Sequence, residues 1–184
     1  MNRTDKVSEM IDSLTSFLQI GLSRGKNFIS LAEEIRHVES YISIQKIRYD
    51  RILDYEIHVS WEMMNYRVIK MILQPLVENA IYHGIKEKDE HGTITITASE
   101  TEDRLILCVA DNGLGMKPER LAEIRDMMAS GAKYNDRAYG VINVQRRIQA
   151  YFGEEYGLDF RSEYTKGTQV YITLPRKEET AQDA

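Results

Sequence analysis

The chain has 184 residues, of which 42% are hydrophobic and 29% are charged, and its formal net charge is −5 at pH 7. These values indicate one globular domain with a short helical addition. They give no reason to expect a nucleic acid partner. Cys108 is the single cysteine, which excludes an internal disulfide and favours a reducing compartment. No apolar run is long enough for a membrane span and no signal peptide pattern opens the sequence, so we expect an intracellular chain.

The first fifty residues carry two helical patterns. Apolar residues recur every three or four positions over about 5–22, which predicts an amphipathic helix. The polar segment 23–27 contains glycine and ends this pattern. Ser30 and Glu33 form a capping box, which predicts a second helix over 31–49. Two successive helices with a short break between them predict an antiparallel hairpin.

The remainder of the chain alternates between strand and helix patterns. Alternating or continuous apolar runs predict five strands, over 53–59, 92–99, 104–110, 157–163 and 168–175. Helical spacing predicts helices over 68–84, 117–130 and 141–152, and Pro75 either kinks the first of these or marks its true start. A polar loop is expected at 131–140. The predicted fold class is α+β, a two-layer α/β sandwich with a mixed sheet that follows a helical hairpin.

Four groups of polar residues and glycines fall at the ends of predicted elements: ENAIYHG (78–84), DNGLGM (111–116), YGVIN (139–143) and KGT (166–168). A carboxylate can accept a hydrogen bond from an exocyclic amine, glycines admit a ring, and a carboxamide oxygen suits magnesium. A helix N-terminus offers free N–H groups to phosphate. The sequence contains neither GxxxxGK[ST] nor GxGxxG. DNG alone favours a turn, but the four groups together favour a nucleotide site.

These motifs resemble the N, G1, G2 and terminal boxes of the GHKL ATP-binding superfamily. With LAEEIRHVESYISIQKIRY (31–49) upstream, the chain resembles the cytoplasmic end of a LytS/YesM-type sensor histidine kinase over about residues 5–175. The resemblance implies a Bergerat-type fold. It divides the chain into the end of a dimerisation and phosphoacceptor region (1–50), an ATP-binding catalytic domain (51–176) and a charged tail (177–184).

The resemblance also implies a function and partners. ATP and Mg²⁺ are the expected ligands, and the γ-phosphoryl group is expected to pass to a histidine on a partner helix. A response regulator is the expected downstream partner. We expect a homodimer in an intact protein whose cytoplasmic part is anchored to a membrane.

Roles for individual residues follow from the resemblance position by position. Asn79 is expected to hold the magnesium ion that bridges the ATP phosphates, and Glu78 to help order the water around that metal. Asp111 is expected to accept a hydrogen bond from the adenine amine, partly through water. Gly113 and Gly115 are expected to shape the wall beside the adenine.

The remaining expected roles concern the ribose, the phosphates and a lid. His83 is expected near the ribose or phosphates. Gly140 and Asn143 are expected to meet phosphate at the start of the following helix, and Thr168 to lie close to the adenine. The segment 117–139 is the expected lid over the nucleotide.

Three positions depart from the family pattern. Tyr82 stands where a lysine is common, and Ala138 stands where the G2 box usually has a glycine. Hydrolytic members carry a glutamate four residues before the asparagine, and that position is Pro75 here. Pro75 therefore favours phosphoryl transfer over hydrolysis. Tyr82 and Ala138 keep one alternative open, a degenerate nucleotide-binding module that acts as a regulatory interaction domain. A second alternative is an anti-sigma-type serine kinase, which shares the nucleotide boxes, but the long helix that contains YISIQKIRY argues against it.

The phosphoacceptor motif of the family, HFLYN, does not occur in this sequence. His37 lies on the second predicted helix among charged residues, so we expect an exposed histidine without a catalytic role. The basic pair Arg146 and Arg147 is likewise expected on a solvated helix face.

Overall fold

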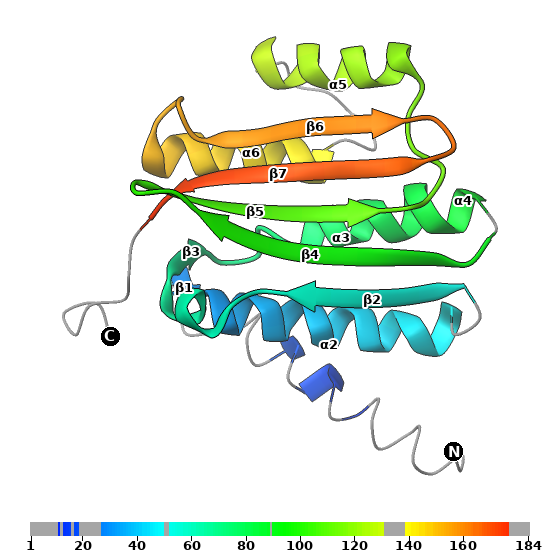
Figure 1. The fold of residues 1–184 in the computed structure, drawn as a ribbon, viewed down its shortest axis with the longest axis horizontal. Helices are drawn as coiled ribbons and strands as arrows, with labels where there is room; N and C mark the ends of the chain where they lie inside the picture. Colours follow the sequence, from blue (N-terminus) through cyan, green and yellow to red (C-terminus); the bar gives the residue numbers. More distant parts are fainter. Residues whose placement is uncertain are drawn as a thin grey trace.

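The computed structural model describes residues 11, 13–15, 17–18, 27–49, 52–88, 90–130 and 139–176. Most of the predicted helix at 5–22, most of the predicted loop at 131–140 and the tail lie outside the described residues. The described part forms a five-stranded sheet with helices on one face and a small two-stranded sheet beside it (Figure 1). Within this part, no helix is long and apolar enough to span a membrane.

The elements before the nucleotide motifs build one side of the molecule. In chain order they are β1 (Phe28–Ser30), α2 (Leu31–Tyr49), β2 (Leu53–His58), the 3-10 helix η1 (Trp61–Asn65) and β3 (Arg67–Ile69). The elements that follow are α3 (Gln74–Asn79), the π-helical segment η2 (Ala80–Ile85), α4 (Lys86–Lys88), β4 (Gly92–Glu100), β5 (Arg104–Asp111), α5 (Pro118–Ser130), α6 (Tyr139–Phe152), β6 (Gly157–Glu163) and β7 (Gly167–Pro175).

The main sheet has the strand order β2-β4-β5-β7-β6. β2 and β4 are parallel, whereas the other neighbouring pairs are antiparallel, so the sheet is mixed as predicted. The five predicted strands are therefore confirmed. The register between β5 and β7 places Asp111 opposite Thr168, which brings two of the predicted site residues to one end of the sheet.

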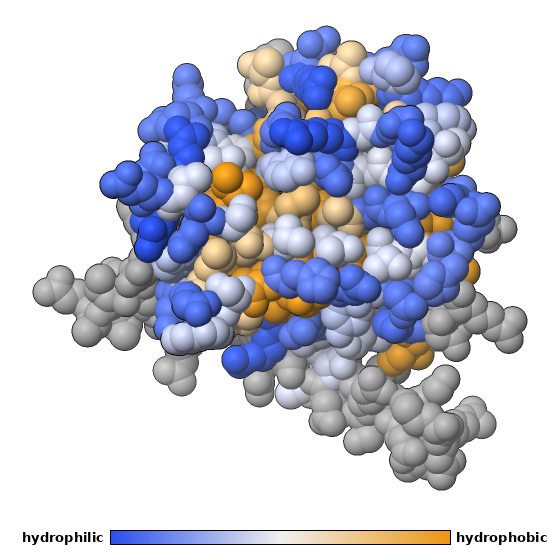
Figure 2. Space-filling model, in the orientation of Figure 1, coloured by the Kyte–Doolittle hydropathy of each residue, from blue (hydrophilic) through white to orange (hydrophobic). Residues whose placement is uncertain are grey.

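One face of the sheet forms the core with the helices. Apolar side chains alternate along the central strands, and those facing the helices are buried, namely Ile94, Ile96, Leu105, Leu107, Val109, Ile172 and Leu174. α3 and α6 cover this face in Figure 1. The opposite face carries half-buried small and polar residues such as Thr95 and Thr97, and it forms part of the mixed surface in Figure 2. This is a two-layer sandwich.

The start of α2 follows the predicted capping box. The Glu33 carboxylate accepts hydrogen bonds from the backbone N–H (2.9 Å) and the hydroxyl (3.0 Å) of Ser30. The Glu33 N–H donates in turn to the Ser30 hydroxyl at 3.2 Å. Two N-terminal donors of the helix are thereby satisfied. The confirmed capping box explains why α2 begins at Leu31.

His37 is buried, so the expectation of an exposed histidine on α2 was wrong. Its ring stacks on Phe17, with 4.6 Å between centroids and an interplanar angle of 14°. Phe17 belongs to the described part of the first helical segment, and it packs against the side of α2 that carries His37 and Tyr41. Burial, together with the charge of Lys70, lowers the pKa of His37.

The helix predicted from residue 68 begins later than the apolar spacing suggested. Val68 and Ile69 belong to β3, which pairs antiparallel with β1. α3 begins at Gln74, with Pro75 in its first turn. Proline fits there because the first-turn N–H groups have no intrahelical partner. Of the two interpretations of Pro75, the helix start is confirmed.

Candidate nucleotide-binding site

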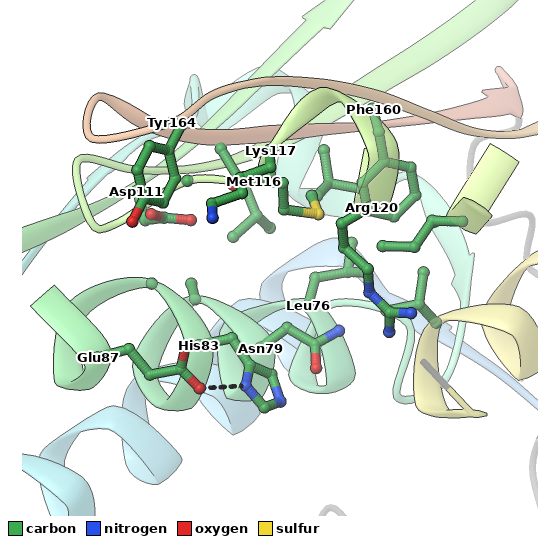
Figure 3. A pocket seen from close by; sticks show the side chains of 18 residues that line it. Leu76, Asn79, His83, Glu87, Asp111, Met116, Lys117, Arg120, Phe160 and Tyr164 are labelled. Carbon is green, nitrogen blue, oxygen red and sulfur yellow. Dashed lines mark hydrogen bonds and ion pairs between the residues drawn. The ribbon is translucent and has the colours of Figure 1, made fainter. Parts of the chain in front are cut away.

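A cleft of about 540 Å³ opens between α3–η2 and the ends of β5 and β7. α5 and the β6–β7 turn form its opposite side (Figure 3). Five of the predicted binding residues line it: Asn79, His83, Asp111, Gly115 and Thr168. These residues come from three separate motifs, which the fold brings together at one end of the sheet.

Asp111 lies at the end of β5 with its carboxylate turned into the cleft. Its Oδ1 accepts a hydrogen bond from the Gly113 N–H at 2.9 Å. Burial raises the pKa of Asp111 to about 6, although the N–H groups of Gly113 and Thr168 act in the opposite direction. A Cβ on Gly84 would lie 2.6 Å from Oδ1. The absence of a side chain at Gly84, the glycine that ends ENAIYHG, therefore makes room for this carboxylate.

The DNGLGM turn is held against two neighbouring elements. Gly113 touches the helix, because a Cβ there would lie 2.2 Å from the Gly84 carbonyl carbon. The Leu114 N–H donates to the Gly84 carbonyl at 2.9 Å. Gly115 has a φ of 66°, and a Cβ there would lie 2.1 Å from the Glu163 carbonyl oxygen. The glycines of this motif therefore serve close backbone packing, which a hairpin turn does not require.

Asn79 and His83 project from the helical side of the cleft (Figure 3). Asn79 is the last residue of α3, and His83 lies in the π-helical segment η2. The His83 Nδ1 is 3.1 Å from Glu87 Oε1, one turn further on. A π-helical segment within an α-helix is uncommon and frequently marks a functional site.

Four predicted residues lie outside the lining of this cleft. Gly113 is buried behind Asp111, against Gly84. Glu78 lines an adjoining hollow with Asn79 and Tyr82, and its carboxylate accepts from the Gln74 side chain at 2.8 Å. Gly140 and Asn143 lie in the first turns of α6, where Gly140 is exposed and Asn143 is half-buried.

Residues that sequence reasoning did not single out as ligands form the opposite wall. Lys117, which directly precedes α5, and Arg120 in the first turn of α5 line the cleft, together with Met116, Phe160 and Tyr164 (Figure 3). The Lys117 ammonium lies 5.4 Å from the centre of the Tyr164 ring. The Arg120 guanidinium is 3.0 Å from the Glu123 carboxylate. Lys117 and Arg120 thus place positive charge on the wall that faces Asn79. Tyr82, which stands where a lysine is expected from the family resemblance, carries no such charge.

Tyr82 faces α2. The Tyr82 hydroxyl hydrogen-bonds to that of Tyr41 in α2. Burial raises the pKa of Tyr41, and the charge of Glu78 and this hydrogen bond act in the same direction. The Lys86 ammonium lies 5.8 Å from the centre of the Tyr82 ring. The tyrosine at this family lysine position therefore joins η2 to α2.

The comparisons with known proteins match both parts of the chain. Residues 64–178 match the family described as "Histidine kinase-, DNA gyrase B-, and HSP90-like ATPase". The chain belongs to this family. Residues 1–53 match a second family, "Histidine kinase". Together with the relatives below, these matches make the chain an ATP-binding catalytic domain of the histidine kinase type, as the resemblance predicted.

Curated relatives are sensor histidine kinases. The chain is 32% identical to sensor histidine kinase YesM of Bacillus subtilis over 178 residues, which cover 97% of this chain and 29% of the relative. It is 28% identical to sensor histidine kinase BtsS of Escherichia coli, covering 96% of this chain and 29% of the relative. The chain thus spans less than a third of these relatives.

Solved structures share the fold. The catalytic domain of histidine kinase ThkA superposes with a TM-score of 0.59 at 20% identity, covering 83% of this chain and 97% of that one. A histidine kinase domain from Erythrobacter litoralis gives a TM-score of 0.58 at 17% identity, covering 93% and 75%. At these identities the likeness concerns the fold, and it confirms the predicted α+β architecture.

Proposed function

We propose that this chain binds Mg-ATP in the cleft and delivers the γ-phosphoryl group to a histidine on a helix outside the chain. The observation that carries the proposal is the convergence of Asp111 and Asn79. A half-buried carboxylate and a carboxamide from distant motifs meet in one cleft that is large enough for a small ligand. Family membership makes ATP the nucleotide that this arrangement fits.

The adenine would bind at the side of the cleft that is formed by the ends of β5 and β7. Asp111 would accept from the adenine amine, and Gly115 and Thr168 line the same part of the cleft. Apolar side chains, among them Val109 and Val170, complete this part of the lining and suit the faces of an aromatic ring.

The phosphate end fits a magnesium ion that is held mainly by the nucleotide. Among the described residues, no group of three or more His, Cys, Asp or Glu side chains is arranged to hold a metal. Mg²⁺ in phosphate sites commonly takes one or two protein ligands and fills its shell with phosphate oxygens and water. The Asn79 carboxamide fits that role, while Lys117 and Arg120 would neutralise charge from the facing wall. When bound, the ion would screen the charge that builds up on the phosphates.

The chemistry proposed is transfer rather than hydrolysis. In a transfer step, a histidine nitrogen forms a bond to the γ-phosphorus while the bond to the β–γ bridging oxygen breaks and ADP leaves. Positioning and charge neutralisation are the main protein contributions to such a step. Pro75, at the position of the hydrolytic glutamate, cannot activate water, and it lies in the first turn of α3.

The partners follow from the same proposal. We place a phosphoacceptor helix, a second copy of the chain and a response regulator around this domain in the intact protein, whose remainder anchors it to a membrane. One solved histidine kinase of this fold was determined in complex with a response regulator protein. The names of the curated relatives also support a sensor kinase.

Calorimetric titration with ATP, with and without Mg²⁺, tests the site directly. We expect tight binding by the parent only with the metal, and we expect Asn79→Ala to lose most of that metal dependence. Asn65→Ala, an exposed change in η1, is the matched control and should bind like the parent. An Asn79→Ala chain that binds Mg-ATP as tightly as the parent would contradict the metal assignment.

A further inference from the structure

A carboxylate on α2 is buried against the turn that precedes α3. Glu34 is fully buried, although a solvated position would be the ordinary place for a glutamate. Its Oε2 accepts from the Met71 N–H at 2.8 Å. Its Oε1 accepts from the N–H groups of Ile72 (2.8 Å) and Leu73 (2.9 Å). One side chain thus satisfies three consecutive backbone donors.

A second side chain, that of Arg147, binds the backbone carbonyl groups of the same turn. Arg147 of α6 donates to the Lys70 carbonyl at 2.7 Å and lies 3.5 Å from the Met71 carbonyl oxygen. Its predicted place on a solvated helix face was therefore wrong. Met71 has a φ of 58°, a left-handed conformation that a side chain bearing a Cβ rarely adopts. Contacts on both sides keep the turn in this conformation.

The beginning of α2 is joined to the strand that leads into this turn. β1 pairs with β3, and the Leu31 N–H donates to the Tyr66 carbonyl at 2.8 Å. The Lys70 N–H donates to the Asn27 carbonyl at 3.0 Å. Figure 1 shows β1 and β3 beside the start of α2. The segment 66–73 is therefore attached to the α2 region along its whole length.

The turn also starts the helix that carries the proposed metal ligand. The Leu73 N–H is bound by Glu34, while the Leu73 carbonyl accepts from the N–H groups of Leu76 (3.1 Å) and Val77 (3.0 Å) in the first turn of α3. Asn79 ends the same short helix. A shift of the Glu34 carboxylate would therefore move the first turn of α3 and, with it, Asn79.

We propose that Glu34 and Arg147 are positioning residues that set the place of the Asn79 carboxamide through the turn 70–73. The inference rests on the proposed function, since Asn79 matters only if it meets a metal-nucleotide complex. It connects α2, which lies in the segment that matches the histidine kinase family, to the nucleotide site.

The electrostatics fit a positioning role. Burial raises the pKa of Glu34, while the three N–H groups and the charge of Arg147 act in the opposite direction. Buried charges that are fully hydrogen-bonded contribute little to stability compared with apolar residues of the same size. What this pair adds is a fixed geometry for one turn.

The test compares ATP affinity with and without Mg²⁺ for Glu34→Gln, by calorimetry on chains whose folding is checked by circular dichroism. Glu34→Gln keeps the size of the side chain and exchanges one acceptor for a donor, which faces a backbone N–H. We expect it to lose roughly 10- to 100-fold in Mg-ATP affinity, the range for groups that orient metal ligands. Binding of metal-free ATP should not change. A merely structural role would not alter the ratio of the two affinities.

The matched control is Glu39→Gln, which removes the same charge from a half-buried position on α2 and should bind like the parent. If Glu34→Gln does not fold, Arg147→Gln carries the test and should show the same selective loss. A folded variant of either kind with parental affinity in both conditions overturns this inference and leaves the proposed function standing. A parent chain that shows no metal-dependent ATP binding would contradict both this inference and the proposed function.

Discussion

Asp111 is held in the cleft at an electrostatic cost. Its pKa in the folded chain is about 6, above the ordinary value of 3.8, because burial disfavours the charged form. Between these values the folded state binds more protons than the unfolded state, so stability falls as pH rises through about 6. At neutral pH the carboxylate therefore destabilises the nucleotide-free chain, and perturbed carboxylates of this kind are typical of ligand sites.

Asp111→Asn should accordingly separate stability from binding. Without nucleotide, we expect the variant to melt at a higher temperature than the parent at pH 8, with a smaller difference at pH 5. For ATP we expect a loss of about 1.5–3 kcal/mol, or roughly tenfold to hundredfold in affinity. Asp159→Asn, an exposed change on β6, serves as the control. Equal ATP affinities in the folded parent and the folded variant would show that DNG forms a turn and does not bind the nucleotide.

Arg120 provides a second test at the same scale. Because its guanidinium faces Asn79 across the cleft, we expect Arg120→Gln to weaken ATP by about tenfold, and AMP much less. Arg161→Gln is the control, since Arg161 is exposed on β6 and lies against the Tyr171 ring. Competition titrations with ATP, ADP and AMP measure the effect. A loss of the same size for all three nucleotides would argue against a phosphate contact.

At the scale of elements, two glycines should respond differently to an added methyl group. A Cβ on Gly113 would collide with the Gly84 backbone at 2.2 Å, so the turn or η2 must move. Overpacking of this kind costs about 1–3 kcal/mol, and we expect a loss of that size for Gly113→Ala in urea unfolding.

Gly140→Ala is the matched comparison. The nearest atom to its new Cβ is Pro75 Cβ at 3.5 Å, an ordinary contact, and the site is an exposed helical turn. Alanine is better than glycine in helices by about 1 kcal/mol, so we expect equal or greater stability. A drop in ATP affinity without a loss of stability would support the expected phosphate contact of Gly140. An equally large destabilisation by both variants would contradict the difference in packing.

The element boundaries show where sequence patterns were sufficient. The capping box of Ser30 and Glu33 lies within one turn of chain, and α2 began as predicted. Val68 and Ile69 suit a helix by spacing, yet they form a strand because β1, some forty residues away, supplies the partner. The π-helical segment also went unpredicted, because no local residue pattern specifies the wider turn.

At the scale of the molecule, the motifs predicted the fold and the cleft but not the contacts between helices. Asp111, Asn79 and Thr168 could be found because each sits at an element end within a recognisable motif. Glu34 could not, since its three donors lie 37 to 39 residues further along the chain. Lys117 and Arg120 follow DNGLGM at positions that carry no distinctive pattern. The division of the chain at residue 50 and the roles of the lid stay predictions.

Phosphoryl transfer to a separate acceptor tests the central claim most directly. The parent chain is incubated with Mg²⁺ and γ-labelled ATP, with and without a helical fragment that carries the HFLYN motif, and the phosphorylated residues are located by mass spectrometry. We predict acid-labile phosphate on the histidine of the fragment, none on the four histidines of the chain, and no transfer by Asn79→Ala. Phosphate on His37, abolished by His37→Gln, would contradict this assignment, as would an unlabelled fragment beside a chain that binds Mg-ATP.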